Sequence, residues 1–344
     1  MCFEKNPHET LRACENARKT LHRNQHNRLW LPPDLNPNKP VKIKSYIAMD
    51  RIEEMSTSAA LVWAAEYERR TIKMDEPPPI FDLDKWDPKL LKKFEQIGFF
   101  QRFGYEFTTG SNEGVIDDIM TVPFYSGTQA QMEKANEDLV RLVEHIDPSY
   151  QLDIEMRLAL NSAIGEAANN AREHAHSPDH VFKYPHVERW WATGAASISK
   201  REIVICLFDQ GVTIPISYPK LPAFSRLKTI LNLFDPNPSS PYQNDAVLIQ
   251  AATEYGKSGR PPETGLGGAK AKKSSAVGGY GLPQIKDAIN LCGGGTLIIL
   301  SRGGRYIYRV DGKNIEEQLD TYDYSIGGTL IEWTVKLPMS GPPQ

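Results

Sequence analysis

The sequence has little cysteine and no long apolar run. Its four cysteines (Cys2, Cys14, Cys206 and Cys292) are scattered and form no CxxC pair, so we expect neither a disulfide framework nor a zinc site, and a reducing compartment suits them. No apolar run approaches the roughly 20 residues that cross a bilayer. The first residues, MCFEKNPHETLRACENARK, are polar and lack the apolar segment of a secretory signal. We therefore expect a cytoplasmic protein without membrane contact.

The sequence also lacks a strong charge of one sign. Its net charge is −3 at pH 7, so a nucleic-acid partner is not indicated. The phosphate-binding pattern GxxxxGK[ST] is absent as well. The remaining composition, with 40% hydrophobic and 24% charged residues, is typical of a globular protein. The length of 344 residues suggests about two domains.

Proline-rich and alternating segments predict how the first part of the chain is organised. Residues 1–40 are polar and end in LPPDLNPNKP, which indicates an arm or linker that could contain a short helix. Residues 41–125 are expected to form a small α/β domain that opens with an alternating strand, VKIKSYI, at 41–47. A helix capped by a serine or threonine is expected at 56–70.

Residues 126–344 are expected to form the larger domain, and the protein as a whole to be of the α+β class. Helical periodicity covers 129–146 and 150–176. The almost wholly apolar EIVICLF, at 202–208, predicts a buried strand. A segment rich in Gly, Pro, Lys and Ser runs from about 234 to 281, and closing strands are expected in TLIILSR, RYIYRV and GTLIEWTVKLP.

The stretch EAANNAREH carries the first candidate site. Glu166, Asn170 and His174 are spaced four apart, so they lie on nearly one stripe of a helix. A carboxylate, an amide oxygen and an imidazole in line could orient a water, ligate a hard cation and contact a phosphate. A polar helix face in water is an equally good interpretation of this segment alone.

Two further candidates lie at strand ends. In FDQGVTIP, Asp209 directly follows the buried strand, and Gly211 permits close backbone approach. Such an aspartate could accept a hydrogen bond from the exocyclic amine of adenine, although an ordinary turn is the alternative. In GGTLIEWTV, Thr329 begins a late strand that could lie beside the strand carrying Asp209.

The glycine-rich AVGGYGLPQIK enters a helix and offers free backbone N–H groups and a positive dipole end to phosphates. Lys286 lies about one turn inside that helix. A tight turn before a helix start is the alternative interpretation.

The order of these segments resembles the GHKL ATPases, the ATP-binding fold of histidine kinases, gyrase-type topoisomerases, the Hsp90 chaperone and MutL. The resemblance covers about 130–338. Glu166, Asn170, Ala171 and His174 match the family box E-x-x-x-N-A-x-x-H, and the wording EAANNAREHA looks most like the anti-sigma-factor serine-kinase branch. The resemblance implies an α/β sandwich, with a mixed sheet covered by helices on one face, that binds ATP and Mg²⁺.

The resemblance also implies roles for individual residues. Glu166 would orient or deprotonate the attacking nucleophile, and Asn170 would ligate Mg²⁺. Asp209 would read adenine with help from Thr329. The residues implied to bind the nucleotide are Asn170, His174, Asp209, Gly211, Thr213, Gly278, Gly279, Tyr280, Gly281, Leu282, Lys286 and Thr329. The sequence departs from the pattern at Thr213, where DxGxG has its second glycine, and at Pro283, where many members carry glycine.

Between the two glycine motifs, residues of about 255–278 are expected to form a flexible ATP lid. Its basic residues, Lys257, Arg260, Lys270, Lys272 and Lys273, have an electrostatic reason to close over phosphates. A solvated loop with incidental charge is the alternative.

The part at about 40–110 resembles more faintly a STAS domain, the fold of anti-sigma-factor antagonists. In that family a regulatory phosphorylation site lies at the helix start that Ser56, Thr57 and Ser58 occupy here. A simple helix N-cap is the favoured alternative, because Met55 and Ala59 break the family pattern.

The two resemblances imply a regulatory switch with a protein partner. An anti-sigma-type serine/threonine kinase is expected first. A MutL-like ATPase that dimerises or exchanges partners, and a nucleotide-binding scaffold without turnover, are the alternatives. A homodimer is compatible with each of them.

Overall fold

The computed structural model describes residues 1–26, 49–75, 77–78, 80, 82–106, 115–116, 118–127, 132–148, 152–174, 181–184, 186–220, 239–254 and 281–338. The helices are α1 (Pro7–His26), α2 (Thr57–Met74), η1 (Leu83–Lys85), α3 (Pro88–Gln96), α4 (Phe99–Arg102), α5 (Met132–Ile146), α6 (Ile154–His174), α7 (Ile214–Ser217), η3 (Tyr218–Lys220), α9 (Asp245–Glu254) and α10 (Gly281–Cys292). The strands are β1 (Val115–Ile116), β2 (Ile119–Gly127), β3 (Trp190–Ser197), β4 (Glu202–Asp209), β5 (Gly294–Ser301), β6 (Gly304–Asp311), β7 (Asn314–Thr321) and β8 (Thr329–Lys336).

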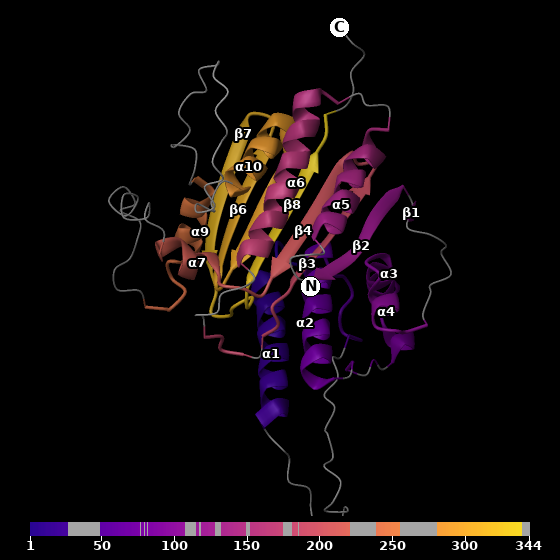
Figure 1. Ribbon diagram of the computed structural model, residues 1–344, viewed down its shortest axis with the longest axis vertical. Coiled ribbons are helices and arrows are strands. Elements are labelled where there is room, and N and C mark those ends of the chain that lie inside the picture. Colours follow the sequence, from indigo (N-terminus) through magenta and orange to yellow (C-terminus); the bar gives the residue numbers. More distant parts are fainter. Residues whose placement is uncertain are drawn as a thin grey trace, which may run out of the picture.

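The strands form one sheet in the order β1-β2-β3-β4-β8-β5-β6-β7 (Figure 1). Every neighbouring pair is antiparallel. The last strand, β8, inserts between β4 and β5, so the sheet is completed from its middle.

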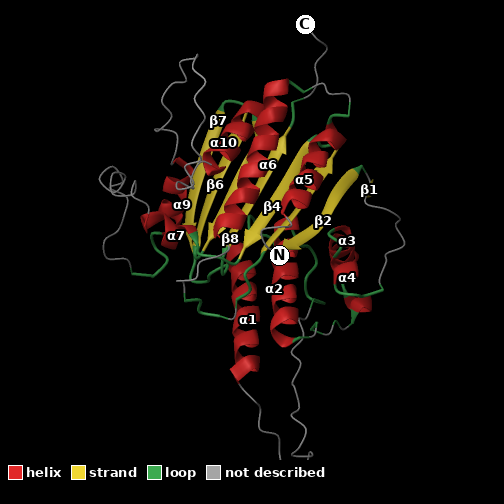
Figure 2. Ribbon diagram, viewed as in Figure 1, coloured by secondary structure: helices red, strands yellow, loops and turns green. Residues whose placement is uncertain are grey.

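Helices α5, α6, α9 and α10 cover one face of the sheet. The core on that side takes Ile205 and Leu207 from β4 and Trp333 from β8, and packs them against Leu160 of α6 and Ile285 of α10. Figure 2 shows α5, α6 and α10 crossing in front of the strands.

The opposite face is covered by the N-terminal helices, and α1 and α2 emerge below the sheet in Figure 2. Helix α2 contacts both β3 and β4. Its buried face joins a second core that holds Trp191 and Phe208, whose rings stack with centroids 5.7 Å apart. Since side chains alternate across a strand, β4 sends Leu207 to one core and Phe208 to the other.

The α+β class is confirmed, but the expectation of a mixed sheet covered on one face is wrong. The sheet is antiparallel throughout and covered on both faces by described helices. The physical reason is that the central strands are apolar on both sides, so each side needs its own helical layer.

The expected arm at 1–40 is also wrong over its first 26 residues. Phe3, Leu11 and Cys14 are fully buried, and α1 packs along α2. The apolar residues of 1–26 are separated by charged and polar ones, so the sequence does not show the buried face of α1 as a clear pattern. Residues 27–48, which include the strand expected at 41–47, lie outside the described residues.

The described residues of 41–125 do not build a core of their own. They share the second core with β4, β5 and β6, and β2 carries the chain across the boundary predicted at 125. The described parts of the two expected domains therefore share one sheet.

Local predictions did better than the domain boundaries. The helix expected at 56–70 is α2, and Ser56 caps it by accepting a hydrogen bond from the Ala59 N–H at 3.2 Å. Ser58 is fully buried. The N-cap interpretation of this segment is thus confirmed. Strand β7 was not expected, because as an edge strand it is exposed along most of its length and carries mainly polar residues.

No helix among the described ranges is long and apolar enough to cross a membrane.

The packing of α1 predicts a large effect from truncating Leu11. Replacing this fully buried side chain in Leu11→Ala should lower the free energy of unfolding by about 2–5 kcal/mol, measured by urea denaturation with tryptophan fluorescence. The exposed Leu158 of α6 provides a matched control, since Leu158→Ala should change the stability by less than about 0.5 kcal/mol. Equal, small effects in both variants would mean that α1 does not pack on the sheet.

Candidate functional site

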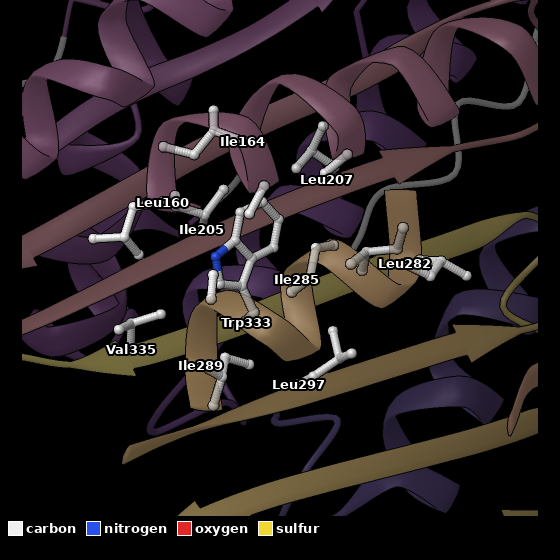
Figure 3. Packing of buried hydrophobic residues seen from close by; sticks show 14 of the residues in the cluster. Leu160, Ile164, Ile205, Leu207, Leu282, Ile285, Ile289, Leu297, Trp333 and Val335 are labelled. Carbon is white, nitrogen blue, oxygen red and sulfur yellow. The ribbon is translucent and has the colours of Figure 1, made fainter. Parts of the chain in front are cut away.

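Three of the segments singled out in the sequence, those of Asp209, Leu282 and Thr329, reach the same end of the sheet, and α6, which carries the fourth, packs against α10. Leu207, near the end of β4, and Leu282, at the start of α10, lie on the same side of the labelled core in Figure 3. Helices α6 and α10 pack against each other, and the Ser162 hydroxyl donates to Gln284 Oε1 at 2.7 Å. Strand β8 begins at this same end, because its first residue pairs with the last residue of β4.

Asp209 lies at the centre of this end. It is the last residue of β4 and pairs directly with Thr329, as the sequence suggested. Its carboxylate accepts the Gly211 N–H at 2.8 Å. Burial raises the pKa of Asp209 to about 7, and the bond from Gly211 only partly opposes this effect. The group is therefore an acceptor with little solvation.

Thr329 belongs to a small hydroxyl network beside Asp209. Its Oγ1 lies 2.8 Å from the Oγ of Ser301, the last residue of β5. The Ser301 hydroxyl in turn accepts the N–H of Ile214 at 2.9 Å. The network links the start of β8 and the end of β5 to Ile214, which follows β4 in the chain.

The two glycines before Thr329 are required by close backbone contacts. A Cβ on Gly328 would lie 1.8 Å from the carbonyl oxygen of Asp209. Gly327 has φ +77° and passes over the guanidinium of Arg18, which a Cβ would approach to 2.8 Å. The GGT sequence thus lets β8 start directly against Asp209 and against helix α1.

The local backbone explains why Thr213 can stand where the DxGxG pattern has its second glycine. Thr213 is the N-cap residue of α7, with φ −70° and extended backbone, so no glycine is needed there. Its carbonyl accepts the N–H groups of Ile216 and Ser217. Its own hydroxyl is buried, and no residue in the described part of the chain forms a hydrogen bond with it.

The stretch EAANNAREH is in the helix expected for it. Glu166, Asn170 and His174 all lie in α6, and the Glu166 side chain is half-buried. The side chains of Asn170 and His174 lie outside the described part. Among the side chains that are described, no group of three His, Cys, Asp or Glu residues is placed to hold a metal ion.

Helix α10 begins at Gly281, where the glycine-rich segment was expected to enter it, and Pro283 lies in its first turn. Leu282 packs into the core, so only its backbone is available to a ligand. Gly278, Gly279, Tyr280 and the expected lid at 255–278 lie outside the described residues.

Lys286, another predicted site residue, is held by contacts within the protein. It is almost fully buried, and its ammonium pairs with Glu254 and lies 3.2 Å from Glu317. It also donates to the Tyr306 hydroxyl at 3.0 Å. Through these contacts the lysine joins α10 to α9, β6 and β7. Two carboxylates already compensate its charge.

Sequence reasoning missed two residues at this end of the sheet. Ser301 follows a clear strand pattern, and its terminal hydroxyl was the only available signal. Gln210 is 2% exposed, and within the described ranges neither its amide oxygen nor its amide nitrogen has a hydrogen-bond partner. A glutamine between an aspartate and a glycine gives no sign of burial in the sequence.

No protein-family model matches the chain, and comparison with curated proteins gives no match either.

The raised pKa of Asp209 predicts how stability depends on pH. The folded protein holds this proton up to about pH 7, whereas an unfolded aspartate releases it near pH 3.9. The unfolded state therefore binds fewer protons between these values, so this group favours folding at low pH, and its contribution is lost as the pH rises through 7.

Asp209→Asn removes the titration. Its stability relative to the unsubstituted protein should rise between pH 4 and 7, by up to about 4 kcal/mol, and level off above that. The check is urea denaturation of both proteins across this range. Parallel stability curves would contradict a desolvated carboxyl.

Proposed function

We propose that this protein binds Mg-ATP in the manner of GHKL proteins and acts as a regulatory switch, most like an anti-sigma-type serine/threonine kinase. The observation that carries the proposal is Asp209. It is a buried carboxyl at a strand end, paired with Thr329 and holding one hydrogen bond among the described residues. Asp209 can accept further hydrogen bonds, and the exocyclic amine of adenine is a suitable donor.

The arrangement around Asp209 supports the same proposal. The start of α10 lies at this end of the helical layer, where a helix N-terminus favours phosphate. Helix α6 packs on α10 and carries the E-x-x-x-N-A-x-x-H box. In the proposed site Asp209 and Thr329 take the adenine, and Gly281 with the backbone of Leu282 takes the phosphates.

Glu166 is proposed to orient the attacking nucleophile, and Asn170 to hold the magnesium ion. Magnesium supplies charge neutralisation on the phosphates when bound. Lys286 is left out of the proposed site because Glu254 and Glu317 already compensate it. A separate STAS-like domain is not carried forward either, since the described residues of that region cover the sheet.

Calorimetric titration with Mg-ATP tests the adenine site. At a pH above the Asp209 pKa of about 7, where the carboxylate is charged, Asp209→Asn should weaken binding at least about tenfold, because a hydrogen bond to a charged group contributes about 1.5–3 kcal/mol. The control is Glu202→Gln, at the opposite end of the same strand, which should bind like the unsubstituted protein. Unchanged affinity in Asp209→Asn would remove this residue from the site.

Incubation with ATP labelled on the γ-phosphate tests the reaction. Label on the protein or on an added partner indicates a kinase, and free phosphate alone an ATPase switch. Absence of both indicates a scaffold without turnover.

Glu166→Gln should keep ATP affinity and lower transfer or release by about 10²–10⁴-fold, the range typical of a lost general base. Glu155→Gln, in the exposed first turn of the same helix, is the control. Full turnover in Glu166→Gln rejects the catalytic role.

A further inference from the structure

A cleft of about 230 Å³ opens beside the loop that follows β4. Its walls come from α1 and α2 on one side, from the segment before β3 on another, and from the turns before β6 and β8. Helices α1 and α2 belong to the layer that the GHKL resemblance does not cover. The volume is below the roughly 300–1,000 Å³ of drug-sized ligand pockets, so the cleft suits a small ligand or one end of a larger one.

The lining of this cleft is basic. Arg18, Arg69, Lys183 and Arg302 all contribute to it, and no carboxylate does so among the described residues. The carboxylates that pair with these basic residues do not themselves line the cleft. Glu66 pairs with both Arg18, at 2.9 Å, and Arg69. Asp245 pairs with Arg302, and Glu15 lies 3.6 Å from the ammonium of Lys183. Glu66 is shared by two guanidinium groups, so the four basic residues of the lining outnumber the three described carboxylates that pair with them.

The electrostatics of Arg69 agree with this description. Burial, with help from the neighbouring charge of Arg18, lowers the pKa of Arg69 to about 10, although Glu66 opposes the change. A bound anion would relieve this unfavourable environment.

Three residues that line the cleft also hold buried polar atoms for which no described residue is a hydrogen-bond partner. They are both amide atoms of Gln210, the hydroxyl of Thr213 and Nε of Arg18. Buried polar groups are paired in the great majority of cases, and each exception costs free energy. Their concentration in one basic cleft indicates that something polar completes them.

We propose that this cleft binds a small oxyanion, a phosphate or carboxylate group, alone or at the end of a larger ligand. The four basic residues supply the charge. Gln210, Thr213 and Arg18 supply the hydrogen bonds.

The proposed oxyanion site is separate from the adenine site. Leu207 faces the core under α6, and Phe208 faces the core under α2. By alternation, Asp209 points to the α6 side of the sheet, whereas the cleft reaches α1 and α2. Gly211 lines the cleft and also donates its N–H to Asp209, which makes the two sites neighbours.

Calorimetric titration of the full chain with inorganic phosphate and with malonate, at constant ionic strength, tests the proposal. We expect saturable binding of at least one of the two. Gln210→Leu should weaken that binding at least tenfold. It should also raise the melting temperature of the unliganded protein, because it removes two unpaired polar atoms. Lys183→Met, on an exposed side chain, should weaken binding several-fold without loss of folding.

Gln250→Leu is the matched control. Its amide is outside the cleft and already donates to Glu317, so this variant should bind the anion normally. Asp209→Asn should keep anion binding, and Gln210→Leu should keep ATP binding. Absence of binding by both anions overturns the proposal, since water alone would then complete the polar groups. Joint loss of ATP and anion binding in both variants also overturns it, because the cleft would then be part of the nucleotide site.

Discussion

Strand β4 is apolar on both of its faces, and the arrangement of the molecule depends on covering them both. Alternate residues such as Leu207 and Phe208 enter two different cores. Neither face can be left to water, so the chain supplies one helical layer from α5, α6, α9 and α10 and another from α1 to α4. The same double cover desolvates the end of the strand. A carboxyl placed there, Asp209, cannot ionise as easily as it would in water.

Arg18 connects the N-terminal layer to the candidate site. Its guanidinium reaches Glu66 on α2 and the carbonyl of Ile326 in the turn before β8. The next residues, Gly327 and Gly328, pass so close to Arg18 and Asp209 that only glycine fits. A shift of α1 would therefore move the start of β8, and with it Thr329. Helix α1, which is far in the sequence from the predicted nucleotide-binding residues, therefore affects the position of one of them.

The sequence predicted what is local and periodic. The cap at Ser56, the buried strand β4 and the entry into α10 at Gly281 follow from nearest-neighbour chemistry. The neighbourhood of Asp209 and Thr329 followed from motif order and is observed. Partners distant in the chain could not be predicted. Lys286 resembled a phosphate ligand until Glu254 and Glu317 were found around it, and α1 resembled a linker because its apolar residues are few and widely spaced.

The contacts of α1 also bear on how the chain reaches this state. Arg18 bonds a residue 308 positions later, and the carbonyl of Phe3 accepts from Arg305, 302 positions later. At synthesis rates of roughly 5–20 residues per second, these partners emerge on the order of 15–60 s after α1. During that interval the core that takes up Phe3 and Leu11 still lacks its residues from β5, β6 and β8. Because closure over so long a loop is also slow, docking of α1 is expected to be a late event in folding, and the period before it is when the chain is most exposed to aggregation.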